Sequence, residues 1–225
     1  MKTKVSHTPK EPQPSDTSLG AYYPYFEHIA RTLVKYFQIR TVLDIGCNTG
    51  ALVKAFRDLG VKAYGVDVSR AAISNAPREL RGQLYCLDAT RDRLPFQDES
   101  LDFITMLDTL EHLPRFEWIV CEIKRTLKAG ACIYISTPSK ITETVTRMTF
   151  RRNDPSHINV QSRRFWIRLL QSSSLKYLCD FPKAERKKAL TAVSISKFIP
   201  RLILKIYSMP LIPDFRSNLI FQKRL

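Results

Sequence analysis

The most constraining feature of the sequence is a short apolar strand that runs directly into a glycine turn and then into a helix. Residues 42–45 are predicted to form a buried strand and residues 46–50 a tight turn, and apolar positions recur at helical spacing over residues 51–59. Glycines in such a turn let the backbone approach a ligand closely. Strand, turn and helix together open a βαβ unit, which predicts a nucleotide-like ligand where the turn meets the helix.

An acidic residue, Asp44, lies just before this turn. A carboxylate at that point suits a cationic or amino group and would repel a pyrophosphate. The dinucleotide fingerprint G-x-G-x-x-G also fails, because Asn48 and Ala51 stand where its second and third glycines would be. The turn is therefore predicted to bind a ligand other than a dinucleotide.

Residues 44–50, Asp-Ile-Gly-Cys-Asn-Thr-Gly, resemble motif I of the class I S-adenosylmethionine (SAM)-dependent methyltransferases, [DE]-x-G-x-G-x-G. Asn48 replaces the middle glycine, and Asn tolerates left-handed backbone better than most residues. Residues 94–113 and 127–138 are similar to the "LPF … LEHL" and "LK-x-G … STP" patterns of the small-molecule, ubiquinone-pathway-like (type 11/12) members of this family. The match covers about residues 40–180 and implies SAM as the cofactor.

Three acids stand at the ends of three predicted strands. Asp67 follows the strand over residues 61–66, where a carboxylate can accept both ribose hydroxyls of a nucleoside. In the resembled family an acid at the position of Asp88 binds the adenine amino group, and the next backbone N–H meets a ring nitrogen. The alternative for each acid alone is a turn former or a helix cap. The resemblance implies a cofactor-binding set made of Asp44, Gly46, Cys47, Asn48, Gly50, Asp67, Val68, Asp88, Ala89 and Leu107.

Alternating strand and helix signals predict a Rossmann-like, doubly wound α/β domain. The resemblance adds a seven-stranded sheet of order 3-2-1-4-5-7-6 with its last strand antiparallel. Residues 19–225 are predicted to form this domain after a disordered tail, residues 1–18. A helix over residues 116–127, closed by Gly130, and a basic amphipathic insertion over about residues 183–213 are also expected.

The net charge of +15 is distributed unevenly, since residues 140–225 hold 18 Lys and Arg against 5 Asp and Glu. This asymmetry predicts an acidic partner, namely nucleic acid, an anionic membrane or a phosphorylated substrate, or else a solvated basic surface. Within this part, residues 192–209 carry a basic stripe beside a wide apolar arc, on a helix predicted to begin near Ile199 and to end before Pro210. Peripheral contact with an anionic membrane and packing of the arc against the sheet are the two interpretations.

Three observations predict a cytoplasmic protein, with peripheral membrane contact if residues 192–209 bind lipid. No stretch approaches the ~20 apolar residues of a membrane span. The first residues lack the apolar run of a signal peptide. The five cysteines form no C-x-x-C pair, which indicates reduced and mostly buried thiols.

The chemistry that SAM implies needs little more than alignment, because its methyl group is already activated. A hydroxyl acceptor also needs a base, and the ends of strands four and five offer three catalytic candidates: Asp108, His112 and His157. For His112 the alternative is a helix-start residue in a widespread family pattern. The predicted acceptor is a small or amphiphilic molecule, a lipid headgroup or a glycan, methylated on oxygen. An RNA 2′-O-methyltransferase and a non-catalytic SAM-binding partner protein are the alternatives.

A divalent ion is a further hypothesis. Asp108-x-x-Glu111-His112 with the distal His157 resembles the Glu-x-x-Glu-His plus His set that binds a divalent ion in small-RNA 2′-O-methyltransferases, with Asp in place of the first Glu. A related triad occurs in ubiquinone-pathway O-methyltransferases. Carboxylate and imidazole ligands together suit Mg²⁺ or Mn²⁺. Many relatives carry this pattern without a metal, so metal-free activity is the main expectation.

Overall fold

Strands and helices alternate through the first half of the chain, as the sequence predicts. The computed structural model describes residues 19–140, 143–144, 148, 154–182, 185 and 216–224. The helices are α1 (Leu19–Tyr36), α2 (Ala51–Asp58), α3 (Arg70–Ser74), η1 (Arg78–Leu80), η2 (Leu110–His112), α4 (Glu117–Thr126) and α6 (Arg163–Ser172). The strands are β1 (Thr41–Ile45), β2 (Lys62–Asp67), β3 (Leu84–Cys86), β4 (Leu101–Leu107), β5 (Leu127–Pro138), β6 (Leu175–Asp180) and β7 (Arg216–Lys223).

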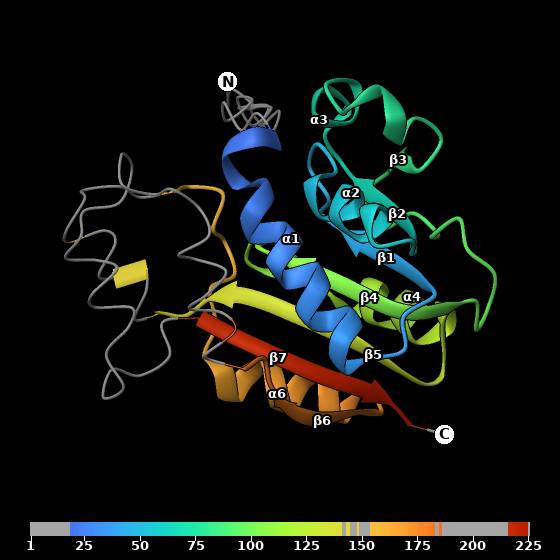
Figure 1. Ribbon diagram of the computed structural model, residues 1–225. Coiled ribbons are helices and arrows are strands. Elements are labelled where there is room, and N and C mark those ends of the chain that lie inside the picture. The colour runs from blue at the N-terminus through green and yellow to red at the C-terminus, as the bar shows by residue number, and fades with distance from the viewer. Residues whose placement is uncertain are drawn as a thin grey trace.

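These strands form one seven-stranded sheet of order β3-β2-β1-β4-β5-β7-β6 (Figure 1). The pairs from β3 to β5 are parallel, whereas β7 pairs antiparallel with both β5 and β6. The predicted strand order and the antiparallel last strand are therefore confirmed.

Two apolar cores cover the two faces of the sheet, which makes the domain a three-layer α/β structure. Helices α1 and α2 pack on one face and α4 and α6 on the other (Figure 1). Strand β1 contributes side chains to both cores, because alternate side chains of a strand point to opposite faces. Val42 joins the core under α1 and α2, while Leu43 and Ile45 join the core under α4 and α6.

The parallel strands place their carboxyl ends along one edge of the sheet. Ligands of doubly wound sheets bind outside this edge, at the point where the strand order reverses. Here the reversal lies between β1 and β4, which pair with each other although β2 and β3 come between them in the sequence. The glycine turn after β1 and the residues after β4 therefore meet at the ligand edge.

Two local predictions are wrong. The helix before β5 is not closed by Gly130, because α4 already ends at Thr126 and Gly130 lies inside β5 with a φ of 75°. Pairing with β4 explains this, since the register shifts between the Leu101 and Phe103 pairs and leaves an irregular stretch around the glycine. The cysteines are also not mostly buried. All five are free, with Cys47 and Cys132 buried and the others exposed: Cys86, Cys121 and Cys179.

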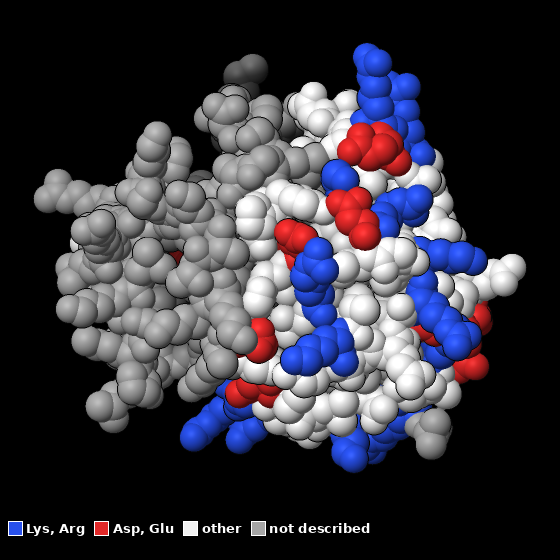
Figure 2. Space-filling model, in the orientation of Figure 1, with Lys and Arg blue, Asp and Glu red and all other residues white. Residues whose placement is uncertain are grey.

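The expected insertion over residues 183–213, apart from Glu185, and the tail over residues 1–18 lie outside the described residues. The helix expected from about Ile199 to just before Pro210 lies outside them as well. Among the helices that the structure describes, none is long and apolar enough to cross a membrane. Basic and acidic side chains are interspersed over the described surface in view (Figure 2).

Candidate active site

The glycine turn after β1 has the left-handed backbone that its sequence predicts. Gly46, Asn48 and Gly50 have φ values of 81°, 50° and 84°. A Cβ atom on Gly46 would lie 2.2 Å from Oγ1 of Thr109, a residue that follows β4. Only glycine fits there, so the turn packs directly against the segment after β4. Asn48, which stands where the resembled motif has glycine, also has a left-handed backbone, which Asn tolerates better than most residues.

Asp67, the last residue of β2, organises the turn through its carboxylate. One oxygen accepts a hydrogen bond from the backbone N–H of Asn48 at 2.7 Å, and the other accepts one from Ser69 at 2.8 Å. The next side chain, Val68, is 67% exposed although it is apolar. A carboxylate beside an exposed apolar side chain suits a nucleoside, which combines ribose hydroxyls with an aromatic base.

Asp44 is buried beneath the turn and faces Thr105, its pairing partner on β4. The Thr105 hydroxyl donates a hydrogen bond of 2.7 Å to the Asp44 carboxylate. Burial raises the pKa of Asp44 to about 7, the Thr105 hydrogen bond opposes this rise, and the charge of Asp67 adds to it. A buried carboxyl with no cationic partner among the described residues is suited to the ammonium group of a ligand.

The raised pKa of Asp44 predicts that the ligand-free protein loses stability as the pH rises. As the pH rises, the unfolded chain releases the Asp44 proton around its ordinary pKa of 3.8, whereas the folded protein keeps this proton up to about pH 7. The stabilising contribution is therefore full below pH ~4 and is lost as the pH rises through ~7, by up to roughly 4 kcal/mol. In urea denaturation at pH 5 and pH 8, the Asp44→Asn variant should show a smaller fall in the free energy of unfolding than the wild type. An equal fall in both proteins would contradict the assignment.

The other residues predicted to bind the cofactor lie around this turn and at the end of β3. Cys47 is buried against Gly65, and Leu107 packs on the core under α1 and α2. Asp88 lies in a turn, where one carboxylate oxygen accepts from the backbone N–H and the hydroxyl of Thr90. This is the turn-former geometry named as its alternative, and the half-buried Ala89 follows it.

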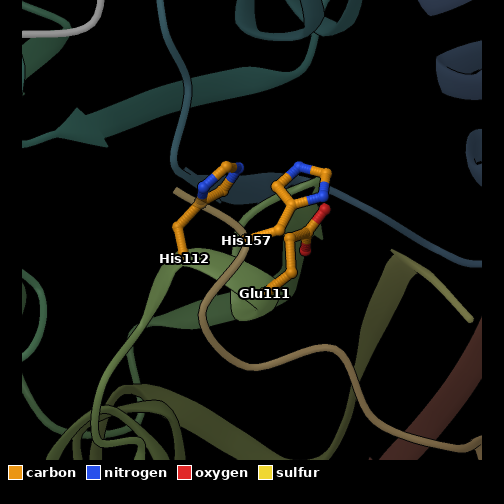
Figure 3. Close-up of side chains that lie close together, drawn as sticks. All are labelled: Glu111, His112 and His157. Atoms are coloured by element: carbon orange, nitrogen blue, oxygen red, sulfur yellow. The ribbon is translucent and has the colours of Figure 1, made fainter. Parts of the chain in front are cut away.

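Beyond β4, the structure brings three of the four metal candidates together and separates the fourth. Glu111, His112 and His157 each offer a ligand atom, and these atoms lie within 4.8 Å of one another (Figure 3). Asp108 has a φ of 49° and instead pairs with Arg216 at the start of β7. Its side chain is 56% exposed, so it lies at the surface of the same edge.

Glu111 is the buried member of this cluster. Its Oε2 accepts a hydrogen bond of 2.9 Å from Thr137 at the end of β5, and its Oε1 has no hydrogen-bond partner in the part of the chain that the structure describes. Burial raises the pKa of Glu111 to about 7, and the Glu143 and Asp154 charges contribute. The group therefore changes protonation near neutral pH.

The two histidine rings lie edge to face with centroids 4.9 Å apart. Nδ1 of His112 lies 3.2 Å from the Ser156 carbonyl oxygen, and burial, followed by the charge of His157, lowers the pKa of His112. Nδ1 of His157 lies 3.1 Å from the Glu143 carboxylate. The loop that carries His157 is fastened to η2, because the backbone N–H of Asn159 donates to the Glu111 carbonyl oxygen.

Sequence reasoning missed Glu143 and Arg216. Glu143 stands four residues after Ser139, and its backbone N–H donates to the Ser139 carbonyl oxygen, but no local pattern in the sequence indicates its contact with His157. Arg216 approaches Asp108 only because β7 returns antiparallel beside β5, and no local pattern indicates that contact.

Comparisons with known proteins agree with this geometry. A family model described as a methyltransferase domain matches residues 19–179. Ubiquinone biosynthesis O-methyltransferase of Idiomarina loihiensis is 31% identical over 105 residues, which cover 44% of this chain and 42% of that protein. 24-methylenesterol C-methyltransferase 2 of Arabidopsis thaliana is 27% identical over 140 residues, which cover 60% of this chain and 37% of that protein. The matches thus span less than half the length of these relatives.

Solved structures show the same fold. The crystal structure of the YcgJ protein from Bacillus superimposes with a TM-score of 0.60 at 20% identity and covers 88% of this chain and 99% of that one. Because the family match extends over most of the chain, and the fold and the glycine turn agree with it, the protein belongs to the family of SAM-dependent methyltransferase domains.

Proposed function

We propose that this protein is an enzyme that transfers the methyl group of SAM to an oxygen atom of a small amphiphilic acceptor. One observation supports this most. Gly46 of the glycine turn packs directly on Thr109, two residues before the cluster of Glu111, His112 and His157, so a cofactor bound at the turn and an acceptor beside the histidines would share one edge of the sheet. Methyl transfer needs this proximity.

The residues around the turn fit SAM. The close packing of Gly46 on Thr109 keeps side chains out of the ligand edge, and Asp67 with Val68 would hold the nucleoside. Asp44 would face the ammonium group of the methionine part. When bound, SAM supplies an activated methyl group. The chain itself then has to orient the acceptor, exclude water and accept one proton.

Two histidines favour oxygen as the reacting atom, because a hydroxyl must lose its proton as the new bond forms and a neutral imidazole can accept it. Burial lowers the pKa of His112, which favours the neutral form of this imidazole. The relatives' names include ubiquinone and a sterol, which supports an amphiphilic acceptor, but they include both O- and C-methyltransferases.

Incubation with methyl-labelled SAM tests the proposal. Three acceptors are offered in parallel: a 4-alkylcatechol, an RNA oligonucleotide with a free 3′-terminal ribose, and a neutral oligosaccharide. We expect label on a catechol oxygen, identified by the chemical shift of the methyl group. Label on a ring carbon would contradict the choice of oxygen, and label on RNA alone would favour the 2′-O-methyltransferase alternative. SAM binding without transfer to any acceptor, including host lipid and small-molecule extracts, would favour the non-catalytic partner protein.

A divalent ion is the second candidate element of this site. Oε1 of Glu111, which has no hydrogen-bond partner among the described residues, and the two imidazoles form a possible donor set, whose carboxylate suits Mg²⁺ or Mn²⁺. Such an ion would orient the acceptor oxygens, with Glu111, His112 and His157 as its ligands, and is therefore the alternative to proton transfer onto His157. If it binds, Mn²⁺ should broaden the imidazole NMR signals of both histidines, and EDTA should reverse the effect. Unchanged spectra and activity indifferent to EDTA and Mg²⁺ would remove the ion from the account.

Peripheral contact with an anionic membrane through residues 192–209 stays a prediction. It requires co-sedimentation with anionic vesicles that weakens as salt is added.

A further inference from the structure

His157 is surrounded by charged and titratable groups from three parts of the chain. Glu143 comes from the helical turn after β5, Asp154 from the loop of His157 itself, and Glu111 and His112 from η2. Only one of these groups lies within hydrogen-bonding distance of the ring: Oε2 of Glu143, 3.1 Å from Nδ1. The side chains of both partners are largely buried, with 20% of His157 and 26% of Glu143 exposed.

This contact determines which ring nitrogen of His157 carries the proton. A carboxylate accepts hydrogen bonds and donates none when ionised, so Nδ1 must be the protonated nitrogen of the neutral ring. Nε2 then keeps its lone pair. Among the described residues, its nearest charged neighbour is Oδ2 of Asp154, which lies 3.7 Å away, beyond hydrogen-bonding distance.

A backbone hydrogen bond fixes the position of Glu143 in the fold. Its backbone N–H donates to the carbonyl oxygen of Ser139, a buried residue directly after β5. The end of β5 also holds Glu111, through Thr137. One strand end therefore fixes both carboxyl groups relative to the histidine pair.

We propose that Glu143 is a positioning residue, whose carboxylate holds the proton of His157 on Nδ1 and so presents Nε2 to the acceptor hydroxyl as the proton-accepting atom. The role of Nε2 as the proton acceptor rests on the proposed methyl transfer. The tautomer of His157 does not. A base oriented by a second hydrogen-bonded group is the arrangement that nucleophile activation requires.

The proposed step transfers one methyl group to the acceptor and one proton to His157. The acceptor oxygen forms a bond to the methyl carbon, the carbon–sulfur bond breaks with its electron pair going to sulfur, and the hydroxyl proton moves to Nε2 of His157. The positive charge leaves the sulfonium and appears on the imidazolium. Glu143, in contact with Nδ1, stabilises this charge where it develops.

The tautomer of His157 can be read by long-range ¹⁵N–¹H NMR of histidine-labelled protein, with the signals assigned from a His157→Gln variant. We expect the Nδ1–H tautomer in the wild type. The Nε2–H tautomer, or an even mixture of the two, would overturn the proposal without any variant of Glu143. This measurement needs neither SAM nor an acceptor, so its outcome is separate from that of the proposed function.

The Glu143→Gln variant distinguishes positioning from a purely structural contact. Its amide oxygen can still accept a hydrogen bond from Nδ1, but it carries no charge and its NH₂ group can impose the opposite tautomer. We expect kcat on the 4-alkylcatechol probe to fall by roughly 10- to 100-fold, part of what a general base contributes. The SAM dissociation constant and the melting temperature should not change, and Glu143→Asp should restore part of kcat.

Glu27→Gln is the matched control, since Glu27 pairs with Arg31 on the surface of α1. It should leave kcat and the His157 signals unchanged. Full activity and an unchanged tautomer in Glu143→Gln would overturn the proposal, because the contact would then serve only to fasten the loop. If the probe is not methylated by the wild type, the proposed function fails on that acceptor, and the tautomer in the wild type and in Glu143→Gln still decides the role of Glu143.

Discussion

Replacing His157 with alanine is expected to slow methyl transfer by roughly 10²- to 10⁴-fold, the contribution that a well-placed general base makes. The imidazole lies beside His112 and Glu111 at the edge where the proposed acceptor binds. Its Nδ1 contacts the Glu143 carboxylate, whereas Nδ1 of His112 contacts a backbone carbonyl oxygen, so His112 is not an equivalent base. Single-turnover measurements with pre-bound SAM isolate this step from cofactor binding.

The matched control for His157→Ala is His28→Ala. His28 lies on α1, where it contacts Glu185, and it is not part of the cluster of Glu111, His112 and His157. The His28→Ala variant should transfer methyl groups at the wild-type rate. A similar loss in both variants, or a loss in His157→Ala explained by weaker SAM binding, would remove His157 from the chemistry.

Replacing Asp67 with alanine is expected to weaken SAM binding by roughly 10- to 150-fold, which corresponds to the 1.5–3 kcal/mol of hydrogen bonds to a charged group. The carboxylate faces the position expected for the ribose. It also accepts a hydrogen bond from the backbone N–H of Asn48 in the glycine turn. Titration calorimetry with S-adenosylhomocysteine measures the effect without turnover. Asp44→Ala should weaken binding as well, because the ammonium group would lose its carboxylate.

Asp58→Ala serves as the control for Asp67→Ala, because Asp58 lies at the far end of α2 and pairs with Lys54 on the surface. It should bind the ligand as the wild type does. Wild-type affinity in both Asp44→Ala and Asp67→Ala would show that the strand-end acids do not form the cofactor site.

The core of the fold could be predicted because its signals are local. The β1 strand, the glycine turn and the acid at the end of β2 follow from residue order alone, and the structure places Asp44 beside Thr105 and Asp67 beside Asn48. The order of the last two strands came from the family resemblance. Periodicity cannot supply it, since β7 is placed by pairing with strands far away in the sequence.

The failures share a physical cause, which is that tertiary pairing overrides local signals. Gly130 has the positive φ of a helix-closing glycine, but the pairing of β5 with β4 places it in a bulge. Asp108 matches the metal pattern in sequence, yet its partner is Arg216. Glu143 reaches His157 only because the loop over residues 154–159 folds back onto η2.

The central claim, that this edge of the sheet is a SAM site, is tested most directly by calorimetric titration of the wild-type protein. S-adenosylhomocysteine and NAD⁺ are titrated under identical conditions. The account predicts saturable one-site binding of S-adenosylhomocysteine and no heat from NAD⁺, because the carboxylates of Asp44 and Asp67 suit an ammonium group and a ribose and leave no place for a pyrophosphate. Saturable binding of NAD⁺, or no binding of S-adenosylhomocysteine, would contradict it.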